Sequence, residues 1–182
     1  MMKKLYFIYL LLILASVTTT SCEDEQLEGE FAADPVSVAT GSFTASVNGE
    51  GFSSQAIAST EGTIGTTTIE AFSIIAANST GQGISIILNT YDGVGTYALD
   101  LEAGNIGNSG AYSDVGDLND PVLTTYITSL SGGTGSITIT EIDLDNLVTS
   151  GTFSFTAVNN NGEGDTATIT NGVFSNIPII NN

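Results

Sequence analysis

Three acidic residues, Glu141, Asp143 and Asp145, occupy alternate positions in the segment TEIDLDN. On an extended strand, alternate side chains lie on the same face, so these three carboxylates would lie together. Carboxylate oxygens are the ligands that Ca²⁺ takes in proteins. The spacing predicts a calcium site where a strand ends in an acidic corner. The alternative is an acidic surface that only binds water.

A second acidic group, Asp114, Asp117 and Asp120, lies in the segment SDVGDLND, which reads as a loop. Oxygen ligands on a flexible loop also suit Ca²⁺, although neither segment has the twelve-residue pattern of an EF-hand. Calcium is therefore the only cofactor that the sequence suggests, and a solvated acidic loop is again the alternative.

The other chemistry-bearing residue types are scarce. The chain has no His and no Trp, one Cys, and two basic residues, Lys3 and Lys4. Beyond residue 22 there is no side chain for a His-dependent triad, a Schiff-base lysine, a thiol nucleophile or a His-ligated zinc ion. A carboxylate pair could still hydrolyse a glycoside, but a chain with 20 acidic residues always offers some pair. We expect no enzymatic activity and no catalytic residues.

Two tyrosines, Tyr112 and Tyr126, lie near the second acidic group. An exposed aromatic ring can stack on a sugar, so these residues are candidate glycan contacts. The alternative is that both pack in a core, as strand tyrosines often do.

The N-terminus has the pattern of a signal peptide. Two lysines, Lys3 and Lys4, precede the uncharged stretch LYFIYLLLILASV, residues 5–17. This stretch is shorter than the roughly 20 residues that a membrane-spanning helix needs. A basic start, a short apolar segment and small residues before a cleavage point predict a secretory signal peptide.

The only cysteine, Cys22, follows Thr19, Thr20 and Ser21. Small residues before a lone cysteine resemble a bacterial lipobox, although Thr19 stands where that signal usually has Leu. The resemblance implies cleavage before Cys22 and attachment of a diacylglycerol to its thiol, so that residues 1–21 form a lipoprotein signal peptide. The alternative is ordinary cleavage that leaves a free thiol, a liability in an exported protein.

The acidic run Glu23-Asp24-Glu25 resembles the signal that carries Bacteroidota lipoproteins to the outer face of the outer membrane; a solvated linker is the alternative. Because both lysines precede Cys22, the mature chain would carry all 20 carboxylates and no basic side chain. This charge excludes a cationic surface for nucleic acid or anionic lipid. It also predicts that stability rises with ionic strength.

Residues 22–40 predict an acidic flexible tether, and residues 41–182 a single all-β domain. In the domain, apolar residues alternate with Thr and Ser, as in Phe153, Phe155 and Ala157, and Asn-Gly and Asp-Gly pairs fall between the alternating runs. This pattern predicts an antiparallel β-sandwich or barrel with no substantial helix after the signal peptide. About ten strands are expected, near residues 42–47, 51–58, 64–76, 83–90, 95–101, 110–114, 122–129, 135–142, 148–158 and 165–174.

Three local features carry their own expectations. The alternation fails at Ile142, which predicts either a bulge or, as we favour, the end of the strand. Asn171-Gly172 predicts a kink or turn, and Pro178 predicts that pairing stops near the chain end.

The segments GSITITEIDLDN (135–146), VTSGTFSFTAVN (148–159) and ATITNGVFSNIPI (167–179) resemble a family of uncharacterised Bacteroidota lipoproteins. FTASVNGEGF (43–52) and GVGTYAL (93–99) are similar to the same family. The resemblance implies an all-β domain of unknown function in the cell envelope, and it brings no catalytic residues.

The sequence thus suggests a lipoprotein of the outer membrane that faces the cell exterior, with a non-enzymatic binding or structural role. Its alternative role is that of a glycan-binding accessory lipoprotein of a carbohydrate uptake system. The expected partners are the membrane, through the lipid on Cys22, and a glycan or an envelope protein, but no nucleic acid.

Overall fold

The computed structural model describes residues 41–64, 67–100, 107–161 and 164–181, which all belong to one compact unit, Ser37–Asn182. The described residues form ten strands and no helix, which confirms the predicted all-β class. The strands are β1 (Ser42–Val47), β2 (Glu50–Ile64), β3 (Thr67–Ala77), β4 (Gln82–Leu88), β5 (Gly95–Ala98), β6 (Ser109–Asp114), β7 (Thr124–Ile127), β8 (Thr134–Asp143), β9 (Val148–Asn159) and β10 (Thr166–Asn181). Accordingly, this part of the chain contains no helix long and apolar enough to cross a membrane.

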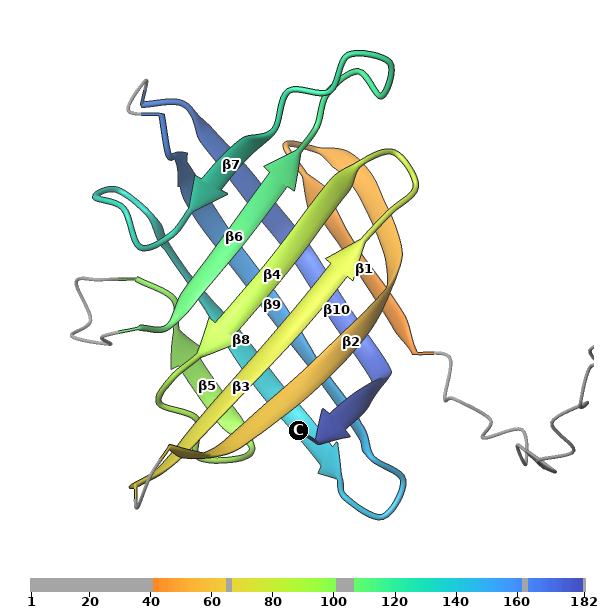
Figure 1. The fold of residues 1–182 in the computed structure, drawn as a ribbon, viewed down its shortest axis with the longest axis vertical. Helices are drawn as coiled ribbons and strands as arrows, with labels where there is room; N and C mark the ends of the chain where they lie inside the picture. The colour runs from red at the N-terminus through yellow and green to blue at the C-terminus, as the bar shows by residue number, and fades with distance from the viewer. Residues whose placement is uncertain (1–40, 65–66, 101–106, 162–163, 182) are drawn as a thin grey trace, which may run out of the picture. The chain divides into compact units, whose positions relative to one another are not determined.

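The ten strands make one mixed, mostly antiparallel sheet in the order β1-β10-β2-β3-β4-β6-β7-β9-β8-β5. Two additional pairings, β1 with β2 and β10 with β9, bring the order back on itself, so the sheet is ring-like. In Figure 1, β2, β3, β4 and β6 lie in front of β8, β9 and β10. Each strand therefore has one face toward the interior and one toward solvent.

Large apolar side chains fill the interior. The rings of Phe43 and Phe153 stack with their centroids 4.9 Å apart, and Phe52 and Phe174 pack around them. Phe43, Phe72 and Phe174 are fully buried together with isoleucines from β3, β4, β8 and β10. Burial of one such side chain stabilises the fold by about 1.5–3 kcal/mol, and the alternation of these residues with Thr and Ser is what produces a two-faced sheet.

The Asn-Gly pair between the first two alternating runs, Asn48-Gly49, forms a turn between β1 and β2. Both residues have positive φ, 51° and 91°, as a tight two-residue turn between β1 and β2 requires. The Asn48 side-chain oxygen also accepts a hydrogen bond of 2.8 Å from the backbone N–H of Thr168, which ties the turn to β10.

One of the other local expectations is met, at Ile142, and one needs correction, at Pro178. At Ile142 both proposed causes of the broken alternation are present: the register of β8 with β9 shifts between Ile139 and Glu141, which is a bulge, and the strand ends at Asp143, one residue beyond Ile142. Pairing does not stop at Pro178: this residue of β10 lies opposite Val148 of β9. Its neighbours Ile177 and Ile179 are buried, and this burial holds the proline in the sheet. Beyond Pro178 the chain pairs with β2 in parallel, from Ile179 to Asn181.

Candidate functional site

The outer face of β8, β9 and β10 carries small hydroxyl side chains. Ile137 and Ile139 of β8 and Phe153 and Phe155 of β9 point inward and are buried. The positions between them are therefore on the solvent side, because side chains alternate along a strand. These outward positions are Thr134, Ser136, Thr138 and Thr140 on β8, Thr152, Ser154 and Thr156 on β9, and Thr166, Thr168 and Thr170 on β10.

The strand register aligns these hydroxyl groups in rows. Thr138 lies opposite Thr152, and Ser136 lies opposite Ser154. A third row joins Thr156 of β9 to a threonine on either side of it, Thr134 on β8 and Thr168 on β10. Neighbouring strands are about 4.8 Å apart and alternate residues of one strand about 6.6 Å apart. The outer face is thus a regular two-dimensional array of hydroxyl groups.

A bulge in β10 interrupts this array and hollows the surface. The register with β9 shifts between Ile169 and Gly172, so that two residues, Thr170 and Asn171, occupy the stretch of β10 facing Ser154. Asn171 has a positive φ of 52°, which Asn tolerates better than most residues. The bulge confirms the kink predicted at Asn171-Gly172.

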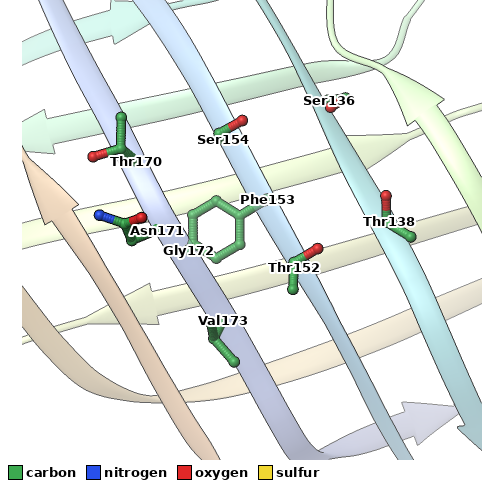
Figure 2. Close-up of a pocket in the computed structure, with 9 residues that line it drawn as sticks. All are labelled: Ser136, Thr138, Thr152, Phe153, Ser154, Thr170, Asn171, Gly172 and Val173. Carbon is green, nitrogen blue, oxygen red and sulfur yellow. The ribbon is translucent and has the colours of Figure 1, made fainter.

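The resulting groove has a volume of about 540 Å³. Figure 2 shows the ring of Phe153 between the ribbons of β9 and β10, with hydroxyl groups on both sides. Gly172 lies opposite Phe153, so a Cβ at Gly172 would lie on the same inner side of the sheet, 2.6 Å from ring atoms of Phe153. The lack of a side chain at Gly172 leaves room for this ring. The groove is lined by Ser136, Thr138, Thr152, Phe153, Ser154, Thr170, Asn171, Gly172 and Val173.

The groove is uncharged and its polar groups face solvent. None of its lining residues is acidic or basic. Thr138 shares a hydrogen bond of 2.8 Å with Thr96 of β5. The hydroxyl groups of Thr152, Ser154 and Ser136 make no hydrogen bond to protein groups within the described residues. They are therefore available to a ligand that offers neutral donors and acceptors.

A second, smaller hollow of about 310 Å³ lies beside β7 and the end of β9. The exposed side chains of Val122 and Leu123 form one side, and Asn159, Asn160 and Asn161 form the other. The Asn159 side-chain oxygen accepts a hydrogen bond of 3.0 Å from the Asn161 backbone N–H. Asn159 thus stabilises the turn that follows β9, which is a structural role.

The two tyrosines proposed as glycan contacts lie on the inner face of the sheet. Tyr112 of β6 is 4% exposed, and its ring centroid is 5.9 Å from that of Tyr126 on β7, which is half-buried. The Tyr112 hydroxyl accepts a hydrogen bond of 3.0 Å from Gln82 Nε2 and donates one of 3.0 Å to Asp114 Oδ2. Tyr112 therefore packs in the core instead of presenting a stacking surface.

Burial shifts the acidity of this tyrosine. Desolvation by burial, together with the hydrogen bond to the Asp114 carboxylate and its negative charge, raises the pKa of Tyr112 to about 12. An anionic phenolate would lose that hydrogen bond and stand next to a negative charge. Tyr112 is thus held as a neutral hydrogen-bond donor.

The acidic corner after β8 is a turn, so Asp145 does not continue the strand face of Glu141 and Asp143. The Asp143 carboxylate accepts hydrogen bonds from the backbone N–H groups of Asp145 and Asn146, at 3.0 and 2.9 Å, and from Asn146 Nδ2 at 2.6 Å. The side-chain and backbone hydrogen bonds from Asn146 lower the pKa of Asp143. The carboxylate serves as the cap of a turn.

The second acidic group behaves in the same way. Asp117 accepts hydrogen bonds of 2.9 Å from the backbone N–H and the side-chain amide of Asn119, which lower its pKa. Asp114 is engaged with Tyr112 and with the backbone N–H of Gly116, and the Asp120 side chain is exposed. Within the described residues, no three acidic, histidine or cysteine side chains come together as ligands for a metal ion.

Cys22 and the acidic residues that follow it lie outside the described residues. The predicted lipidation site therefore stays a prediction from the sequence.

Sequence reasoning noted the Thr- and Ser-rich solvent face but did not single out the residues of the groove. The signal that could have found them is a hydroxyl residue at nearly every outward position of three strands that are consecutive in sequence, residues 134–170. The hollow itself depends on the bulge at Thr170-Asn171, where Asn171-Gly172 predicts a kink but the pattern does not show that the kink hollows the surface.

The described residues thus form an all-β, ring-like domain with an uncharged groove on its outer face. This fold and this surface define a structural class but do not specify an activity. The chain belongs to the family described as a domain of unknown function, DUF6252, whose model matches residues 39–178. No curated protein and no solved structure matches the chain.

Proposed function

We propose that this protein is a lipid-anchored binding domain of the bacterial cell envelope, without enzymatic activity. The observation that carries the proposal is the position of the only cysteine, Cys22, between the apolar stretch of residues 5–17 and the acidic residues 23–25. An odd cysteine at this place is explained if it is the attachment point for lipid. Two or three acyl chains hold a protein on a membrane far more firmly than one.

The proposal places the mature chain on the outer membrane, with the domain directed to the cell exterior. The support is the resemblance of Glu23-Asp24-Glu25 to the export signal of Bacteroidota surface lipoproteins. The high negative charge fits this address, since a chain with no cationic patch is held at the membrane by its lipid and not by anionic headgroups.

Two of the carboxylates, those of Asp117 and Asp143, have a structural role instead of the properties of a catalytic acid. A glycoside hydrolase with two carboxylates needs one with a raised pKa to act as the acid. Hydrogen bonds from neighbouring N–H groups lower the pKa of Asp117 and of Asp143, which is the opposite direction. Both side chains act as caps of turns, and this arrangement favours a structural role for them.

The uncharged groove on β8, β9 and β10 favours the second candidate function, a glycan-binding accessory lipoprotein of a carbohydrate uptake system. Its hydroxyl groups offer hydrogen bonds without charge, which suits a neutral sugar. Tyr112 points inward and is therefore not a glycan contact. The support for a glycan-binding function comes from the groove.

Whole-cell proteolysis tests the proposed address. The full chain is expressed in a bacterium of the Bacteroidota, together with two variants. One variant is Cys22→Ser, and the other combines Glu23→Asn, Asp24→Asn and Glu25→Gln. We expect the native chain to be in the membrane fraction and to be digested by protease added to intact cells. Cys22→Ser should leave the membrane fraction, and the triple variant should stay there but resist the protease. A Cys22→Ser chain that stays membrane-bound would contradict the anchor.

A further inference from the structure

We infer that the groove on the outer face of β8, β9 and β10 binds an uncharged polysaccharide chain. This inference rests on the proposed binding role and adds the site and the chemical class of the ligand. It starts from the groups that line the groove, which are hydroxyls, one amide, one buried ring and one exposed valine.

The hydrogen-bonding groups have the right chemistry for a sugar. A hydroxyl side chain both donates and accepts, and the Asn171 amide offers both as well. Sugar hydroxyl groups have the same dual character, so each contact can form in either direction. Thr152 and Ser154 lie on one strand, with Asn171 and Thr170 across from them in the bulge, and all four side chains are exposed.

The regular spacing favours a polymer over a small solute. The rows Thr138–Thr152 and Ser136–Ser154 repeat the same pair of hydroxyl groups on adjacent strands, and the row Thr134–Thr156–Thr168 continues them. Rows recur about every 6.6 Å along the strands. A ligand that engages several rows must itself repeat its hydroxyl groups, as a polysaccharide does.

The apolar part of the groove completes the surface. Val173 is 45% exposed at one end of the groove, and the inward-pointing Phe153 lines it from below. A sugar ring presents C–H groups on its faces, which can pack on the exposed Val173 side chain while its hydroxyl groups reach the hydroxyl side chains of the groove. Phe153 itself is only 4% exposed, so hydrogen bonds carry most of the recognition.

Charge selects a neutral ligand. The chain has 20 carboxylates, and its only two basic residues precede Cys22. The summed field of these groups repels an anionic polysaccharide. A cationic ligand would be attracted to the chain in general, but the groove lining offers it no carboxylate to pair with. An uncharged glycan has no such penalty and matches the uncharged lining.

Calorimetric titration of the full chain, purified in mild detergent, tests the inference. The probes are three soluble neutral polysaccharides (a mixed-linkage β-glucan, a galactomannan and dextran) and two anionic ones (alginate and polygalacturonate). The groove variant is Thr152→Val with Ser154→Ala, which removes two outward hydroxyl groups with little change of shape. The matched control is Ser53→Ala with Ser85→Ala, which removes two hydroxyl groups from β2 and β4 outside the groove.

We expect at least one neutral polysaccharide to bind and both anionic ones to fail. The groove variant should bind at least about 10-fold more weakly, since each lost hydrogen bond to the ligand costs about a factor of 5, and the control should bind as the native chain does. Equal melting temperatures for the three proteins would show that all are folded.

Three results would overturn the inference. Binding that is unchanged in the groove variant would place the site elsewhere. Preference for an anionic polysaccharide would refute the ligand class, and no binding of any neutral polysaccharide would refute the site and the class together. None of these outcomes affects the lipid anchor, which whole-cell proteolysis tests separately.

Discussion

Gly172 leaves room for the Phe153 ring on the inner face of the sheet, and its replacement gives the sharpest test of the local packing. A Cβ at Gly172 would lie 2.5 Å from the backbone oxygen of Phe153 and 2.6 Å from its ring carbons. Both contacts are below 3.0 Å, so the backbone of β9 or β10 would have to move. The φ of Gly172 is not in the left-handed region, and Gly172→Ala therefore tests the steric contact alone.

The expected size of the effect follows from two opposing contributions. Forcing an extra methyl into a packed site costs about 1–3 kcal/mol. Removing glycine from the unfolded chain stabilises the protein by about 0.4–1 kcal/mol. We expect Gly172→Ala to lower the free energy of unfolding by about 1–2 kcal/mol.

Gly51 of β2 supplies the matched control. It is exposed, and a Cβ there would meet nothing within 4 Å. Gly51→Ala keeps the favourable contribution of about 0.4–1 kcal/mol and carries no steric cost. The two variants should therefore differ by about 1–3 kcal/mol, with opposite signs relative to the native chain.

Urea unfolding of the full chain measures both changes. Far-ultraviolet circular dichroism or tyrosine fluorescence reports the transition, because the chain has no Trp. The slope of the free energy against urea concentration should be the same in all three proteins, so that the midpoints report stability. Equal midpoints for Gly172→Ala and Gly51→Ala, or a gain of stability at Gly172, would refute the close contact with Phe153.

The remaining predictions concern charge. Because the pKa of Tyr112 is raised to about 12 from 10.0, the folded state holds this proton more tightly. Stability should be full below about pH 10 and fall toward pH 12, and an equal alkaline fall in Tyr112→Phe would contradict this. Hydrogen bonds from Asn146 lower the pKa of Asp143, so their contribution to stability is present above its ordinary pKa and is lost as pH falls. In Asn146→Ala, nuclear magnetic resonance titration should find a higher pKa for Asp143, and an unchanged value would refute the assignment. The melting temperature should rise from about 10 mM to about 1 M NaCl as salt screens the carboxylates, and a constant value would show that repulsion does not limit stability.

Much of the fold could be predicted because the solvent face and the core face differ in residue type. In β9, Phe153 and Phe155 alternate with Thr152 and Ser154. An alternation with period two is typical of a β-strand with one buried and one exposed face. The ends of strands were predicted where Asn-Gly or Asp-Gly pairs stand, since these residues accept positive φ. The pattern leaves a sandwich and a barrel as alternatives, because strand order depends on contacts distant in sequence.

The candidate sites were harder to predict for a physical reason. In the segment GAYSD, the neighbours of Tyr112 are small or polar on both sides, and the pattern does not say which face is inside. The sequence therefore leaves a glycan contact and core packing open for Tyr112, and the structure shows Tyr112 buried opposite the half-buried Tyr126. Asp145 was placed on a strand face, but Asp143 accepts hydrogen bonds from the next residues and stabilises a turn there.

The mass of the intact protein extracted from membranes with detergent tests the proposed lipid anchor most directly. We predict a mass equal to that of residues 22–182 plus a diacylglycerol, with or without one further acyl chain. Fragmentation should place the added mass on Cys22. An unmodified Cys22, or a chain that still contains residues 1–21, would contradict a lipid-anchored protein.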